Sequence, residues 1–178
     1  MRLADMQRIV VAVDPSGVSG AEDGGDEVGI IVAGKGVDGC AYILADRSCR
    51  LSPEGWGRRA VEAYKEFKAD RIVAEKNFGG AMVEAVIRAA DPQAPVTLVT
   101  ASRGKAVRAE PIAALYEQGR VYHARNFSEL EDQMVAMTPN GYLGEGSPDR
   151  LDALVWALTE LMLGEQDYNP DMWAALAS

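Results

Sequence analysis

The sequence has few of the residues that form zinc sites or disulfide frameworks. It contains one histidine and two cysteines, Cys40 and Cys49, which lie nine residues apart without a Cys-x-x-Cys pair. This spacing predicts reduced thiols. The N-terminus carries no apolar signal segment, and no apolar run is long enough to span a membrane. We therefore expect a soluble, cytoplasmic protein without a zinc centre.

Positive charge is also scarce. The chain has 18 Lys and Arg residues against 27 Asp and Glu residues, a net charge of -9. This balance disfavours binding of nucleic acid or anionic lipid over the whole surface, although a local basic patch can still bind phosphates. With 178 residues, 48% of them hydrophobic, the chain can bury one good core. We expect one α/β domain over residues 1–163 and a C-terminal tail over 164–178.

Apolar runs and turn residues alternate along the chain. Five strands are expected, at 8–14, 27–33, 39–46, 71–75 and 95–100, and residues 121–123 are compatible with a short additional one. Helices are expected at 52–67, 81–90, 105–118, 128–137 and 148–163, with Ser52, Ser128 and Ser147 as caps, and residues 138–147 are expected to be a loop. Three antiparallel strands followed by strand-helix units predict a mixed five-stranded sheet with helices on both faces.

Two carboxylates stand at the ends of predicted strands. Asp14 follows a buried apolar run, and Glu75 ends the fourth strand. Open α/β sheets place their binding crevices at such strand ends, so these side chains converge if the first and fourth strands are neighbours. Taken alone, Asp14 is equally consistent with an Asp-Pro turn that merely ends the strand.

Two more carboxylates begin the last predicted helix. With Ser147 as the cap, Asp149 and Asp152 lie one turn apart on the same face. Asp149 is also explained by the favourable position of a negative charge at a helix N-terminus. Asp152 is flanked by apolar residues, where a lone ionised carboxylate is costly. This position therefore indicates a functional role for Asp152.

Three or four carboxylates from two strand ends and a helix form a ligand set for a hard cation. Oxygen ligands of this kind suit Mg²⁺ or Mn²⁺. A pair of such ions about 3.5 to 4 Å apart can activate a water on one side of a phosphodiester and stabilise the leaving oxygen on the other. The only histidine, His123, is expected at the surface or near a substrate rather than at a metal.

Three segments in this order carry a family resemblance: Val-Ala-Val-Asp14-Pro-Ser-Gly, Ala-Glu75-Lys-Asn77-Phe-Gly79-Gly80 and Ser147-Pro-Asp149-Arg-Leu-Asp152-Ala-Leu-Val-Trp. They resemble the nuclease domain of the large terminase subunit of tailed double-stranded DNA phages, in the ribonuclease H-like superfamily. The resemblance spans about residues 8–163. It implies a metal-dependent endonuclease that cuts concatemeric phage DNA during packaging in the host cytoplasm. It also implies that Asp14, Glu75 and Asp152 hold two divalent ions, Mg²⁺ or Mn²⁺, with Asp149 as a fourth ligand or helper.

The resemblance also implies partners, with one departure. Large terminase subunits join this nuclease to a packaging ATPase domain and act with a small terminase subunit and a portal. No Gly-x-x-x-x-Gly-Lys-[Ser/Thr] loop occurs in this sequence. The chain is therefore expected to lack packaging ATPase activity, and to be either an excised C-terminal domain or a free-standing nuclease.

The DNA-binding residues are expected near the start of the third helix. Arg103, Lys105 and Arg108 begin a locally basic segment, and Lys76 follows Glu75. These cations suit contacts to a DNA backbone. The alternatives are a solvated helix face for the basic segment and simple screening of the carboxylates for Lys76.

Three rival functions fit parts of the pattern. An actin-like phosphotransferase also places an Asp-x-x-Gly turn after its first strand, but a second phosphate loop and the length for two lobes are missing. A non-catalytic DNA-binding or assembly module of the same fold would bind DNA without metal dependence. A Holliday-junction resolvase of the same fold would prefer branched DNA.

Overall fold

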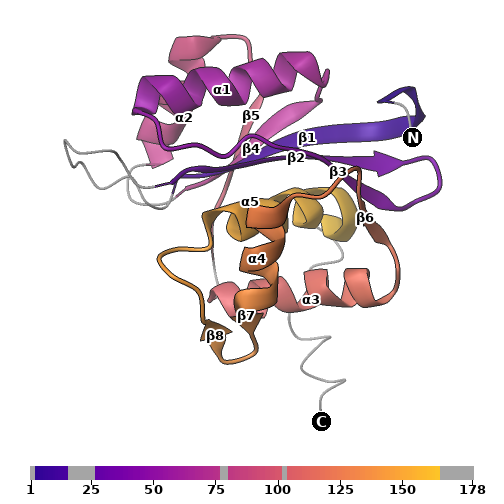
Figure 1. Ribbon diagram of the computed structural model, residues 1–178. Coiled ribbons are helices and arrows are strands. Elements are labelled where there is room, and N and C mark those ends of the chain that lie inside the picture. The colour runs from indigo at the N-terminus through magenta and orange to yellow at the C-terminus, as the bar shows by residue number, and fades with distance from the viewer. Residues whose placement is uncertain (1–2, 16–26, 77–79, 102–103, 165–178) are drawn as a thin grey trace.

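A six-stranded mixed sheet lies at the centre of the computed structural model (Figure 1). The structure describes residues 3–15, 27–76, 80–101 and 104–164. The strands are β1 (Met6–Asp14), β2 (Gly29–Gly36), β3 (Ala41–Asp46), β4 (Arg71–Glu75), β5 (Val96–Val99) and β6 (Val121–His123), in the spatial order β5-β4-β1-β2-β3-β6. The helices are α1 (Pro53–Glu66), α2 (Gly80–Ala90), α3 (Lys105–Glu117), α4 (Ser128–Ala136) and α5 (Asp149–Leu158). A short 3₁₀ turn, Leu3–Asp5, precedes β1.

The predicted mixed sheet is confirmed, and the short strand that residues 121–123 allowed joins the five expected strands as a sixth. β1, β2 and β3 are antiparallel neighbours, β4 and β5 run parallel to β1, and β6 runs parallel to β3. The sixth strand has three residues, too few for a period-two pattern. It is defined by its long-range pairing, Val121 with Ala41 and His123 with Ile43.

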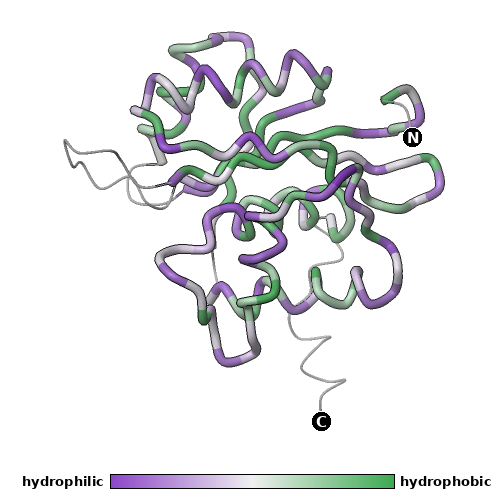
Figure 2. The backbone as a smooth tube through the Cα atoms, viewed as in Figure 1, coloured by the Kyte–Doolittle hydropathy of each residue, from purple (hydrophilic) through white to green (hydrophobic). Residues whose placement is uncertain are grey.

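Each face of the sheet is covered by its own helix layer, as predicted. In Figure 1, α1 and α2 lie on one side of the sheet and α3, α4 and α5 on the other. Alternate residues of β1 serve the two layers: Val11 and Val13 pack toward α1 and α2, whereas Val10 and Ala12 pack toward α5. Figure 2 shows hydrophobic residues along the central strands. The first strand is therefore buried on both faces and holds its last residue, Asp14, rigidly.

Two of the predicted caps differ in the structure. Ser52 caps α1 as predicted, because its hydroxyl accepts a hydrogen bond from the Gly55 N–H at 3.3 Å. Phe127, not Ser128, is the N-cap of α4, and the Glu131 side chain accepts a hydrogen bond from the Phe127 N–H at 3.1 Å. Ser147 does not cap α5, which follows Pro148, and its hydroxyl accepts a hydrogen bond from Lys105 instead.

The last third of the chain differs from the prediction at two places, the expected loop and the end of the last helix. The expected loop over 138–147 contains part of a small hairpin, β7 (Met137–Thr138) with β8 (Gly141–Tyr142). The last helix is α-helical only to Leu158 and continues as a π-helical turn, Thr159–Leu163. The predicted tail lies outside the described residues beyond Gly164. No helix in the described ranges is both long and apolar enough to cross a membrane.

Candidate metal centre

The two strand-end carboxylates lie at the same edge of the sheet. Asp14 ends β1 and is fully buried, and Glu75 ends β4 and is 3% exposed. β1 and β4 are parallel neighbours, with Val13 paired to Ala74. The expectation that the first and fourth strands are adjacent is thus confirmed, because parallel strands bring their carboxyl ends together.

The first turn of α5 brings two more carboxylates to Asp14. Asp149 and Asp152 are 3% and 2% exposed. One carboxylate oxygen from each of Asp14, Asp149 and Asp152 lies within 4.8 Å of the others. Three buried carboxylates at this separation repel one another unless a cation lies among them. Their hard oxygen donors fit Mg²⁺ or Mn²⁺ rather than a metal that prefers nitrogen or sulfur ligands.

Gly29 allows α5 to approach this closely. It pairs with Asp14 across the β1–β2 ladder. A β-carbon at position 29 would overlap the backbone carbonyl of Asp149 and lie 3.0 Å from the Arg150 nitrogen. The role of Gly29 was not among the sequence-based predictions. The available signal was a glycine inside an apolar strand, which often marks the close approach of another backbone.

Glu75 lies beside the triad of Asp14, Asp149 and Asp152 but is not one of its members. Its Oε2 accepts a hydrogen bond from Trp156 Nε1 at 3.1 Å and lies 3.9 Å from Arg108 Nη1. The indole of Trp156 therefore has a polar partner in addition to its place in the core. The structure thus divides the four predicted carboxylates into a group of three and a separately held Glu75.

Two cations from α3 neutralise part of this charge. Lys105 forms an ion pair with Asp152 Oδ2, and its Nζ donates to Ser147 Oγ at 2.9 Å. Arg108 Nη2 lies 3.7 Å from Asp152 Oδ1. Of the four predicted DNA contacts, Lys76 is exposed, Lys105 is partly exposed, Arg108 is only 7% exposed, and Arg103 lies outside the described residues. Arg108 thus faces the carboxylates from within the protein.

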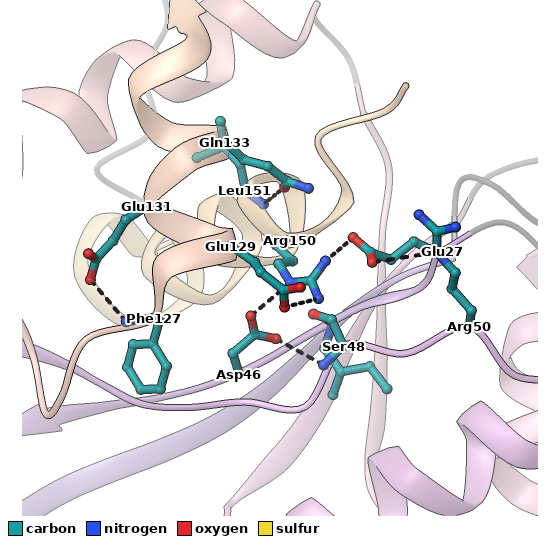
Figure 3. Close-up of polar contacts among 11 residues, drawn as sticks. Glu27, Asp46, Ser48, Arg50, Phe127, Glu129, Glu131, Gln133, Arg150 and Leu151 are labelled. Atoms are coloured by element: carbon teal, nitrogen blue, oxygen red, sulfur yellow. Dashed lines mark hydrogen bonds and ion pairs between the residues drawn. The ribbon is translucent and has the colours of Figure 1, made fainter. Parts of the chain in front are cut away.

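A second arginine, Arg150, fixes the start of α5 through three carboxylates. Arg150 donates to Asp46 Oδ2 at 2.9 Å and to Glu129 Oε2 at 2.7 Å, and also pairs with Glu27 (Figure 3). Burial lowers the pKa of the Arg150 guanidinium, but these three carboxylates outweigh burial and raise it overall. Because Arg150 follows Asp149 directly, its contacts to β3 and α4 position the first turn of α5.

His123 is engaged away from the triad. Its Nε2 shares a hydrogen bond of 2.8 Å with the Tyr116 hydroxyl, and its Nδ1 shares one of 2.9 Å with Glu131 Oε1. Burial, followed by the charge of Glu131, raises the pKa of Tyr116. Within the described ranges, the acidic group able to hold a metal contains no histidine.

The sheet order, the two strand-end carboxylates and the acidic turn of α5 define the class: a ribonuclease H-like fold with an acidic site at the ends of its strands. Residues 11–161 match the profile of the terminase RNaseH-like domain. The chain belongs to this family. No curated protein matches the chain in sequence.

Three solved structures illustrate the fold. The large terminase nuclease from the thermophilic phage G20c superposes with a TM-score of 0.63 at 17% identity, covering 86% of this chain and 82% of that one. A mutant nuclease domain of the large terminase subunit gp2 of bacterial virus Sf6, with manganese and beta-thujaplicinol, gives 0.59 at 17% identity, covering 86% and 89%. RuvC from T. thermophilus, in complex with a Holliday junction substrate, gives 0.53 at 16% identity, covering 89% and 96%. The G20c nuclease has also been solved with bound cobalt, magnesium and zinc.

Proposed function

We propose that this chain is a metal-dependent DNA endonuclease that cleaves concatemeric double-stranded DNA during phage genome packaging. The observation that carries the proposal is the convergence of Asp14, Asp149 and Asp152, all buried, within 4.8 Å. Carboxylates buried this close together repel one another, and a divalent ion bound among them would relieve that repulsion. Membership of the terminase RNaseH-like domain family supports the same function.

Some residues of the site would bind the metal, and others would contact the DNA. Asp14, Asp149 and Asp152 would hold one Mg²⁺ or Mn²⁺, and Glu75 lies where it could supply a ligand for a second ion next to Asp152. When bound, divalent ions activate a water and neutralise charge on the phosphate. Lys76 and Lys105 lie on the rim, where they would contact the DNA backbone, and Arg103 is proposed to join them.

Membership of the terminase RNaseH-like domain family supports a setting in phage DNA packaging. The nuclease would act in the host cytoplasm together with a packaging ATPase domain, a small terminase subunit and a portal. The net charge of -9 supports contact with DNA at a local site rather than over the whole surface. In this setting the nuclease would cut the concatemer when packaging starts and ends.

A junction resolvase is the second candidate. It is favoured by the similarity in fold to RuvC, which was solved with a Holliday junction. A resolvase recognises branched DNA, whereas a packaging nuclease must cut unbranched duplex. The two functions therefore differ in substrate rather than in metal chemistry.

Cleavage of three substrates tests these proposals: linear duplex, supercoiled plasmid and a four-way junction, each with Mg²⁺, Mn²⁺ or EDTA. We expect cleavage of linear duplex and plasmid that EDTA abolishes, without preference for the junction. A strong preference for the junction would favour the resolvase. Binding without cleavage under all metal conditions would favour a non-catalytic module.

A further inference from the structure

Trp156 contacts two charged side chains beside the triad. It lies on α5 four residues after Asp152, so both side chains project from the same side of the helix. Its Nε1 donates a hydrogen bond of 3.1 Å to Glu75 Oε2, and its ring centre lies 4.5 Å from the Arg108 guanidinium. Arg108 Nη1 is in turn 3.9 Å from the same Glu75 oxygen. One indole therefore holds both groups that meet at Glu75 Oε2.

These contacts lie in the interior of the protein. Trp156, Glu75 and Arg108 are each more than nine-tenths buried. A carboxylate in such a place is stabilised by the donors and cations that replace water around it. Both contacts reach Oε2, so the indole and the guanidinium fix one oxygen of Glu75 and leave Oε1 out of this arrangement. A carboxylate that is fixed at one oxygen has a defined orientation, and its second oxygen then has a defined position.

The indole nitrogen is not needed for core packing alone. Trp56 is fully buried in the other helix layer, and no acceptor for its Nε1 is found among the residues that the structure describes. Trp156 also packs in a hydrophobic core, yet its N–H reaches a carboxylate at the edge of the sheet. The two buried tryptophans therefore differ in what the N–H contacts rather than in how the ring is packed.

We infer that Trp156 is a positioning residue for Glu75. Its N–H, together with the guanidinium that its ring holds, fixes Oε2 and thereby sets the position of Oε1 at the carboxyl end of β4. This inference rests on the proposed function, because it assigns Trp156 a part in the cleavage step. Trp156 would act through the carboxylate and would not contact the DNA itself. Loss of the N–H would let the carboxylate rotate and slow cleavage without weakening the binding of DNA.

Steady-state cleavage of a linear duplex in Mn²⁺ by Trp156→Phe tests the inference. This change keeps an aromatic ring in the core and removes the N–H. Hydrogen-bond partners of metal-ligating side chains typically contribute about ten- to a hundredfold to activity. We therefore expect kcat to fall by about this factor while KM for the DNA stays unchanged. Trp56→Phe is the matched control, because it makes the same change in the other helix layer, and its kcat should equal that of the wild type.

Hydrogen exchange of the indole N–H groups, followed by NMR, gives a readout without cleavage and applies even if Trp156→Phe fails to fold. The Trp156 N–H of the wild type should exchange slowly with D₂O. Glu75→Ala removes its acceptor and should speed this exchange by at least about tenfold. The Trp56 N–H in the same spectrum is the internal control, because a general loss of stability would speed the exchange of both indoles.

Three results would overturn the inference while leaving the proposed nuclease intact. They are a wild-type kcat in folded Trp156→Phe, equal losses of kcat in Trp156→Phe and Trp56→Phe, and exchange of the Trp156 N–H that Glu75→Ala does not speed relative to that of Trp56. Absence of cleavage by the wild type with every metal would instead contradict the proposed function. The exchange measurement would then still decide whether the indole holds Glu75.

Discussion

The backbone carbonyl of Asp149 lies against Gly29, in the space that a side chain at position 29 would fill. Gly29 is also the β2 partner of Asp14. The strand-end carboxylate and the first turn of α5 are therefore brought together through a residue that has no side chain. The geometry of the triad depends on this contact as well as on the carboxylates themselves.

Gly29→Ala should force α5 away from the sheet. Overpacking of a well-packed core costs about 1 to 3 kcal/mol, and the obstructing atoms here belong to a backbone that cannot rotate away. Urea denaturation should show a loss in this range, and Mn²⁺ affinity should fall. Gly104→Ala is the control, since a β-carbon at that position meets nothing within 4 Å. Equal losses in the two variants would contradict the proposed packing role of Gly29.

Two arginines that contact Glu27 should differ strongly in their effect on stability. Arg150→Ala removes a buried cation from three carboxylates, and breaking a buried pair costs about 3 to 5 kcal/mol. Arg50 has a side chain 72% exposed and lies 3.9 Å from Glu27, so Arg50→Ala should change the unfolding free energy by less than about 1 kcal/mol. Chemical denaturation of both variants compares these costs, and a similar small effect of each would contradict the positioning role of Arg150.

The ionised side chain of Glu131 should stabilise the fold at neutral pH and lose this effect in acid. The Phe127 N–H and then the hydrogen bond with His123 lower the pKa of Glu131 below its ordinary value of 4.5. A lowered carboxyl pKa adds stability that is present above the unfolded value and is lost as pH falls through the folded value. The stability difference between wild type and Glu131→Gln should therefore be steady near neutral pH and shrink below about 4.5. A difference that widens on acidification would contradict this assignment, and Glu117→Gln serves as the exposed control.

DNA binding should depend on Lys76 and Lys105. Each phosphate contact that is lost reduces the slope of log affinity against log salt concentration by about 1. We expect Lys76→Ala and Lys105→Ala, in an Asp14→Asn background that prevents cleavage, to weaken binding and flatten this slope. Lys65 lies on α1 in the opposite helix layer, and Lys65→Ala should leave the slope unchanged. An unchanged salt dependence in both rim variants would place the DNA elsewhere.

Local patterns predicted the strand ends and the acidic helix turn. Asp14 and Glu75 follow short apolar runs, and such runs reveal buried strands without knowledge of the rest of the fold. Asp152 stood out because an ionised side chain within an apolar helix requires an explanation. These local signals located all four carboxylates that the structure gathers at one edge of the sheet.

Features that depend on long-range packing could not be predicted from local sequence patterns. Arg108 looked like one basic residue of an exposed segment, and only the docking of α3 against Trp156 buries it. Residues 121–123 were compatible with a strand, but only the pairing with β3 establishes β6. Gly29 matters because α5 packs on it. Ser147 is a residue type that often caps helices, yet its hydroxyl accepts a hydrogen bond from Lys105 at the start of α3. In each case tertiary contacts outweighed local preference.

The most direct measurement of the central claim is the rate of supercoiled plasmid cleavage by the wild type, Asp14→Asn, Asp149→Asn and Asp152→Asn in Mn²⁺. Asp132, an exposed residue of α4, supplies the matched control Asp132→Asn. We predict that each triad variant loses at least about a thousandfold in rate, a loss of about 4 kcal/mol of transition-state stabilisation, whereas the control cleaves like the wild type. Cleavage that survives in the triad variants, or in EDTA, would contradict a metal centre built from Asp14, Asp149 and Asp152.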